Sequence, residues 1–133
     1  MALSADRNTP AKDGQDIPVP MAANAVIHGG GIVVANATGY AAPGSTATGL
    51  TYLGRSEEAK DNTGGADGAK TIRVRRKKAF KWKNSGTDPV TQAELGKVCY
   101  IEDDETVAKT NGTSTRSACG VVVGVEADGV WVE

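Results

Sequence analysis

The chain has 133 residues, the usual size of one domain, which leaves no room for separate cofactor and substrate domains. Hydrophobic residues make up 39% and aromatic residues only 5%, so we expect a small core of Val, Ile and Ala, and a tendency to self-associate or dock on a partner. The formal net charge of -1 argues against a surface tuned as a whole for nucleic acid or an anionic membrane.

Residues 1–20 are predicted to form an extended arm ahead of a single β domain at 21–133. Three prolines and almost no apolar periodicity characterise this segment. Its end, Ile17-Pro18-Val19-Pro20, favours a polyproline II conformation because each proline keeps its predecessor out of the α region. We expect the arm to be mobile until it lies on a partner, with Ile17 and Val19 as apolar anchors. No signal peptide or membrane span is expected.

Short strands are predicted from residue 25 onward. The segments 25–28 and 32–35 flank three glycines that can supply a turn or bulge, residues 40–42 can pair back on 32–35, and 50–54 form a further strand. Residues 61–68 carry no hydrophobic anchor beyond one alanine. They are predicted to form a surface loop.

The segment Lys70–Lys83 contains eight basic residues and no acidic one. Its even positions include Ile72, Val74, Phe80 and Trp82, which predicts a core-facing side, and a bulge or sheet corner is expected near residues 76–78. The odd positions form a wet, basic face. From this face we take Arg73, Arg75 and Lys77 as candidate partner contacts.

The remaining segments also predict short strands, with one helical turn at 91–95 from the capping-box spacing of Thr91 and Glu94. Segments 97–101 and 106–108 flank the acidic turn 102–105, and 118–125 and 130–132 form a hairpin through Asp128-Gly129. Trp131 becomes a candidate interface residue in that register. Because no apolar stripe of helical period occurs, we predict an all-β fold, a small barrel or a sandwich.

No catalytic, cofactor or metal site is predicted, so we expect a protein that is not an enzyme. The run His28-Gly29-Gly30-Gly31 matches the oxyanion loop of esterases. However, His28 is the only histidine in the chain, and no nucleophile elbow accompanies the run. Cys99 and Cys119 lack zinc-site spacing and are expected to be reduced, with a single bridge as the alternative. The acidic run 102–105 is interpreted as a solvated turn, since it does not fit a known calcium loop.

Aromatic residues beside basic ones, here Phe80 and Trp82, also suit base stacking on a nucleic-acid-binding β-barrel. Their shared parity with Ile72 and Val74 favours the core instead. The basic face is then free to dock on an acidic protein surface or on another copy, because residues 84–133 hold nine acidic and three basic residues.

The order of the segments carries a further signal. In the first half the informative runs are Ile17-Pro18-Val19-Pro20, Ala22-Ala23, Val26-Ile27, Gly31-Ile32-Val33-Val34 and Tyr40-Ala41. In the second half they are Ala79-Phe80-Lys81-Trp82, Leu95-Gly96-Lys97-Val98-Cys99-Tyr100 and Gly120-Val121-Val122-Val123-Gly124. This succession resembles the capsid decoration, or cement, proteins of tailed bacteriophages, most of all those of Mu-like transposable phages with siphovirus tails.

The resemblance implies a structural virion protein, made in the cytoplasm of the bacterial host, that binds the exterior of the capsid. Its partner would be the major capsid protein, and it would assemble as a homotrimer that stiffens the shell. No small-molecule substrate, cofactor or membrane is implied. The alternatives are a nucleic-acid-binding β-barrel and a tail or baseplate adaptor domain.

Overall fold

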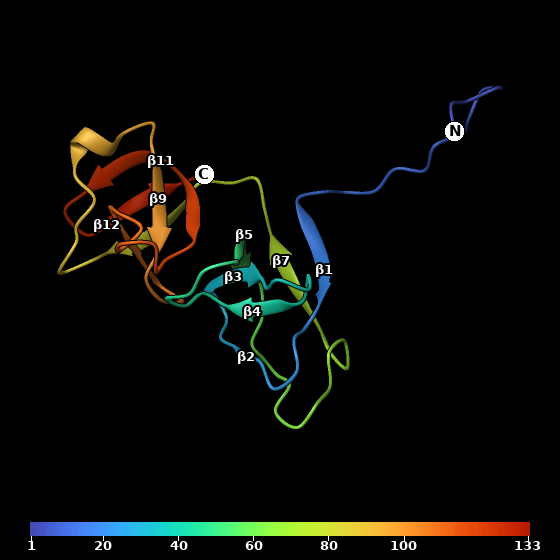
Figure 1. Ribbon diagram of the computed structural model, residues 1–133, viewed down its shortest axis with the longest axis horizontal. Coiled ribbons are helices and arrows are strands. Elements are labelled where there is room, and N and C mark those ends of the chain that lie inside the picture. Colours follow the sequence, from blue (N-terminus) through green and yellow to red (C-terminus); the bar gives the residue numbers. More distant parts are fainter.

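The structure, a computed structural model, describes residues 1–133 and consists of short β-strands joined by turns (Figure 1). The fold is all-β, as predicted, and its one helical element is the 3-10 turn η1 at Gln92–Glu94. No helix is long and apolar enough to span a lipid bilayer. The strands are β1 (Asp16–Pro20), β2 (Val26–Ile27), β3 (Ile32–Ala35), β4 (Ala41–Pro43), β5 (Thr51–Ser56), β6 (Lys60–Asp61), β7 (Thr71–Arg75), β8 (Phe80–Asn84), β9 (Val98–Ile101), β10 (Thr106–Ala108), β11 (Ala118–Glu126) and β12 (Gly129–Val132).

Strands β1 to β7 build what we call the sheet lobe, residues 16–75. Five of them form an antiparallel sheet in the order β1-β7-β5-β3-β4, in which β4 pairs back on β3 as predicted. Strand β2 does not pair with β3 across the three glycines and instead forms a small ladder with β6. The core of this lobe is aliphatic: Val19, Met21, Ala22, Ala25, Ile27, Val33, Ala41, Ile72 and Val74.

Strands β8 to β12 build the barrel lobe, residues 80–133. They close into a barrel in the order β10-β8-β12-β11-β9, and pairing of β9 with β10 completes the circle. A closed barrel leaves no free strand edge. Phe80 and Trp82 point into its core as predicted, with ring centroids 6.0 Å apart.

Residues 76–79, here called the linker, connect the two lobes. The sequence predicts a bulge or sheet corner at this place, and the structure has a crossing from one sheet to the other, with Lys77 in the left-handed region at φ 58°. Every strand ladder lies on one side of the linker or the other. Residues 21–133, for which the sequence predicts a single β domain, therefore hold two lobes.

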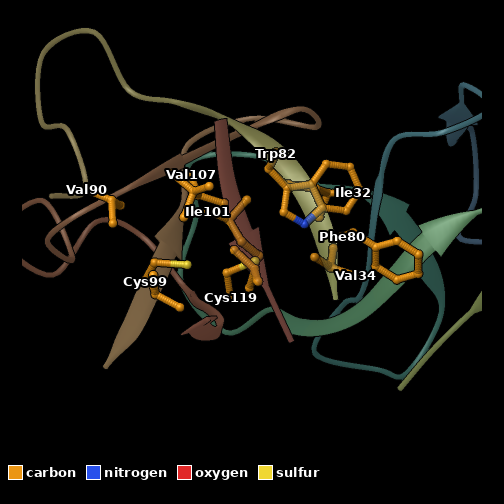
Figure 2. Packing of buried hydrophobic residues seen from close by; sticks show 12 residues of the cluster. Ile32, Val34, Phe80, Trp82, Val90, Cys99, Ile101, Val107 and Cys119 are labelled. Atoms are coloured by element: carbon orange, nitrogen blue, oxygen red, sulfur yellow. The ribbon is translucent and has the colours of Figure 1, made fainter. Parts of the chain in front are cut away.

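Strand β3 holds the lobes together, because its side chains alternate between two cores. Val33 packs in the sheet lobe, whereas Ile32 and Val34 pack in the barrel core, on the side where Figure 2 shows Phe80 and Trp82. The Trp82 indole N–H donates a hydrogen bond of 3.2 Å to the Tyr52 hydroxyl on β5. The lobes are thus joined by side-chain packing and isolated hydrogen bonds, and no strand ladder is shared between them.

The extended arm is shorter than the sequence predicts. Residues 1–15 form no strand, are almost all exposed and project from the body in Figure 1. Asp16–Pro20 is β1, which pairs antiparallel with β7 at the edge of the sheet. Val19 is only 8% exposed and Ile17 packs against the same core, so these two side chains stabilise the sheet lobe and are not free anchors for a partner.

The prolines of β1 do not prevent pairing, because both face away from β7. The Met21 amide donates to the Lys70 carbonyl, and the Gln15 carbonyl accepts from the linker, so odd-numbered residues of β1 direct their backbone groups at β7. Pro18 and Pro20 occupy the outward positions. Their missing N–H groups leave the ladder intact and deprive any additional strand of donors.

The terminal hairpin turns one residue earlier than predicted. Glu126 pairs with Gly129, so the loop residues are Ala127 and Asp128 rather than Asp128 and Gly129. Gly129 belongs to β12, where a side chain is excluded because a Cβ atom would lie 2.8 Å from the backbone carbonyl oxygen of Trp82 on β8. The close passage of β8 therefore sets a register that the dipeptide alone does not specify.

Candidate docking surface

Cationic and aromatic side chains gather where the linker crosses between the lobes. They line an open hollow of about 480 Å³, which we call the junction cleft. Its residues come from β5, β7, the linker, β8 and β12: Arg55, Arg75, Lys78, Ala79, Phe80, Lys81 and Trp131. Both lobes are needed to form it.

Arg55 and Arg75 stand directly opposite each other on β5 and β7. Like charges at opposed positions destabilise a sheet. Arg55 is compensated, because its guanidinium lies 4.8 Å from the Phe80 ring centroid and 2.7 Å from the Glu57 carboxylate. Arg75 reaches the Asp16 carboxylate only at 3.7 Å, and its Nε is buried without a hydrogen-bond partner. Arg75 is therefore the less compensated of the two arginines, and the exposed part of its guanidinium can pair with an anionic group in the cleft.

The barrel side of the cleft is formed by Lys81 and Trp131. The Lys81 ammonium lies 2.8 Å from the Asp128 carboxylate and 5.7 Å from the Trp131 ring centroid. Its hydrogen bond to Asp128 raises the pKa of Lys81 above the ordinary value, so the ammonium stays charged. The Trp131 indole N–H donates to the Glu126 carboxylate, which fixes the half-buried ring.

The linker adds three consecutive cations, Arg76 to Lys78, and none of them is within ion-pair distance of a carboxylate. The Arg76 amide donates a 2.7 Å hydrogen bond to the Gln15 carbonyl, which places the root of the arm beside the linker. Figure 1 shows the arm leaving the body at the end of the sheet where the linker begins. A partner bound in the junction cleft is therefore within reach of residues 1–15.

The structure brings together only two of the predicted contact residues, Arg75 and Trp131, in the junction cleft. Lys77 lies next to them in the exposed linker. Arg73 is on the same strand as Arg75, but its side chain is paired with Asp16 and remains 57% exposed. Arg73 shares a face of β7 with Arg75 but lies two residues farther from the linker, which leaves it outside the cleft.

Sequence reasoning missed Arg55, which contributes the second guanidinium. It lies twenty positions before Arg75 in the chain, in a segment with a single basic residue between Thr51 and Ser56. Only the pairing of β5 with β7 makes the two arginines neighbours. No local signal could have identified it.

The other chemically interesting side chains form no second site. Cys99 and Cys119 form no disulfide and are buried in the barrel, and the pKa of the Cys119 thiol is raised because it donates a hydrogen bond to Cys99 and is buried. No group of three or more His, Cys, Asp or Glu side chains is placed to hold a metal ion. His28 lies beside the acidic turn, in a shallow hollow with Asp104.

Comparison with known proteins identifies no relative: no family model matches the chain, and no curated protein or solved structure is significantly similar to it. The features of the chain that point to a function are the order of its segments and the geometry of the junction cleft.

Proposed function

We propose that this chain is a decoration protein of tailed-bacteriophage heads, which binds the outer surface of the major-capsid lattice and stabilises the shell. The observation that carries the proposal is the junction cleft, where Arg55 and Arg75 are opposed and the partly exposed Arg75 guanidinium comes no closer than 3.7 Å to a carboxylate. The order of the β segments supports the same function through its resemblance to decoration proteins. In this proposal the chain is made in the host cytoplasm and acts on the exterior of the virion.

The chemistry of the cleft selects acidic side chains of the capsid surface. A carboxylate can accept two parallel hydrogen bonds from a guanidinium, and a pairing of this kind in a partly buried cleft is stronger than one at an exposed surface. Arg76 to Lys78 extend the positive potential along the linker and steer the encounter. The arm, residues 1–15, then adds a second contact that becomes ordered on binding.

A nucleic-acid-binding role is less well supported by the geometry. Phe80 and Trp82, the aromatic residues of the basic segment, are 8% and 5% exposed and cannot stack on bases. Trp131 is the one aromatic ring at the cleft besides Phe80, and Glu126 holds its indole N–H. A carboxylate at that position repels phosphate groups.

The proposal is tested with phage heads that lack this protein. They are prepared from a phage whose genome encodes it, after deletion of the gene. We expect the purified chain to co-sediment with these heads at saturable stoichiometry. Arg75→Ser should weaken binding at least tenfold, because the opposed guanidinium pair is broken. Lys60→Ser, which removes a cation from the β2-β6 ladder away from the cleft, is the matched control and should bind like the wild type.

Two results would reject the proposal. One is wild-type sedimentation with heads no greater than that of an unrelated protein. The other is binding of labelled single- or double-stranded DNA tighter than about micromolar at physiological salt, which exceeds ordinary non-specific affinity and would favour the nucleic-acid alternative.

A further inference from the structure

The outer face of β9 and β11 on the barrel carries four exposed aliphatic side chains. Val98 is 43% exposed, Val121 40% and Val123 44%, and Leu95 at the end of η1 is 49% exposed. Val98 and Val121 are direct cross-strand partners. The Gly96 amide donates to the Val122 carbonyl, which brings the end of η1 against β11. We call Leu95, Val98, Val121 and Val123 the aliphatic face.

The sequence of β11 explains why this face exists. From Ala118 to Val125 the strand has no polar side chain, a pattern typical of strands that are buried on both sides. In the isolated chain only one side is covered, because Cys119 and Val122 point into the barrel core. A bulge between Val122 and Gly124 keeps Val123 on the outside. The uncovered side has the composition of an interface.

The neighbouring outer face of the barrel shows the contrast. On β8, Lys81 and Lys83 point outward and pair with the carboxylates of Asp128 and Glu105 at 2.8 Å. That face is charged and exposed to solvent, as expected for a sheet that packs on the core with only one of its faces. The four residues of the aliphatic face are uncharged. The apolar character is therefore local to this face and does not extend over the whole outside of the barrel.

Opposite charges border the aliphatic face on its two sides. On the β10 side, Lys97 and Lys109 line a hollow together with Val98 and Glu94, and the Glu94 carboxylate pairs with Lys109 at 3.7 Å. On the β12 side, Glu133 exchanges backbone hydrogen bonds of 2.9 Å with Val121. Neither Lys97 nor Glu133 takes part in an ion pair within the chain. An apolar centre with a free cation on one margin and a free anion on the other is complementary to itself.

We propose that the aliphatic face is the contact surface between two copies of this chain. When the faces of two copies cover each other, Val121 of each copy leaves water, and Lys97 of one copy lies opposite Glu133 of the other. The junction cleft is lined by other residues and stays open to a capsid. The proposal is independent of the decoration function, because self-association can be measured with the purified chain alone.

The primary test is sedimentation equilibrium of the full chain over a range of concentrations. We expect the wild type to form a discrete oligomer and Val121→Asp to raise its dissociation constant at least a hundredfold, because a carboxylate would be buried in the contact. Val26→Asp is the matched control. Val26 is similarly exposed at 37% but lies on β2 in the sheet lobe, so its replacement should leave association unchanged. Unchanged far-UV circular dichroism confirms that both variants fold.

A charge exchange tests the orientation of the copies. Lys97→Glu and Glu133→Lys should each weaken association about fivefold or more, whereas the double variant should return to within about twofold of the wild type. A monomeric wild type at all concentrations, or equal effects of Val121→Asp and Val26→Asp, overturns the proposal. Single reversals without rescue in the double variant overturn the proposed orientation and, with it, the self-complementary contact. Loss of head binding with intact association would instead refute the decoration function alone.

Discussion

The sheet lobe and the barrel lobe solve the same problem, burying a small core, in different ways. The barrel pairs every strand on both sides and packs two aromatic rings inside. The sheet lobe is open, its core is aliphatic, and its two edges meet only through a single bridge between Met21 and Ala41. The difference teaches that closure gives the barrel its own integrity, whereas the sheet lobe depends on β3 packing against the barrel.

The largest expected effect comes from the barrel core. Trp82→Ala removes the largest buried ring and its hydrogen bond to Tyr52, so we expect a loss of about 3–5 kcal/mol in unfolding free energy. Urea denaturation followed by circular dichroism measures it. Because Ile32 and Val34 insert into the same core, both lobes should unfold in one transition. A sheet lobe that melts separately in wild type would contradict this dependence.

The next test concerns the sheet lobe, at Gly54 of β5. Its φ of 148° lies in a region that favours glycine, and a Cβ atom would approach the Arg75 carbonyl oxygen to 2.1 Å. We expect Gly54→Ala to cost more than the ~1–2 kcal/mol of a left-handed backbone alone, because β5 and β7 must separate. The matched variant Gly39→Ala, with φ 88° and open space around it, should cost less in thermal denaturation. Equal costs would show that the strand contact is not limiting.

A smaller effect is expected in the loops that cover the end of the barrel. Asp88 accepts hydrogen bonds from the Thr110 hydroxyl at 2.6 Å and from Arg116 at 2.9 Å. The Thr110 bond, followed by the Arg116 pairing, holds the pKa of Asp88 below its ordinary value of 3.8. Asp88→Asn should therefore cost about 1 kcal/mol at neutral pH.

The pH dependence of the stability difference between wild type and Asp88→Asn tests whether the ionised carboxylate stabilises the fold. A carboxyl whose pKa is lower in the folded state stabilises the fold fully above its ordinary pKa and loses this contribution as the pH falls through the folded value. The difference between wild type and Asp88→Asn should thus be constant above about pH 5 and shrink below pH 3.8. Thermal denaturation at a series of pH values checks this, and a difference that grows toward low pH would contradict it.

The smallest effect on stability is expected at the free edge of β1, where a substitution should instead change the tendency of the open sheet to associate. Pro18→Val combined with Pro20→Val restores two outward N–H donors while leaving the ladder to β7 intact. Unfolding free energy should change by less than about 0.5 kcal/mol. Light scattering should nevertheless show concentration-dependent association through strand addition. Clear solutions of the double variant at high concentration would mean that another feature protects this edge.

The sequence predicted well what depends on neighbouring residues. The alternation of Ile72 and Val74 correctly gave the buried side of β7, and the spacing of Thr91 and Glu94 gave η1, where the Glu94 carboxylate accepts the Thr91 amide at 2.7 Å. These features follow from strand geometry and local capping, so they need no knowledge of the rest of the fold.

Prediction failed where distant segments decide the outcome. Pro18 and Pro20 indicate an isolated arm by themselves, but in contact with β7 they become an edge strand. The Asp128-Gly129 pair indicates its own turn, but β8 shifts the hairpin by one residue. The junction cleft could be predicted only in part, since Arg55 joins Arg75 through a strand pairing that no local pattern specifies.

Because no ladder crosses the linker, a cut after Lys77 would break one peptide bond and no strand pairing. The two halves would remain joined by Ile32 and Val34 in the barrel core and by the Ile32 amide, which donates to the Asp104 carbonyl at 2.7 Å. The chain is thus organised as two fragments that can hold together without the peptide bond between them. Trypsin should nick the exposed linker without releasing either half, and fragments 1–77 and 78–133 produced separately should reassemble on mixing.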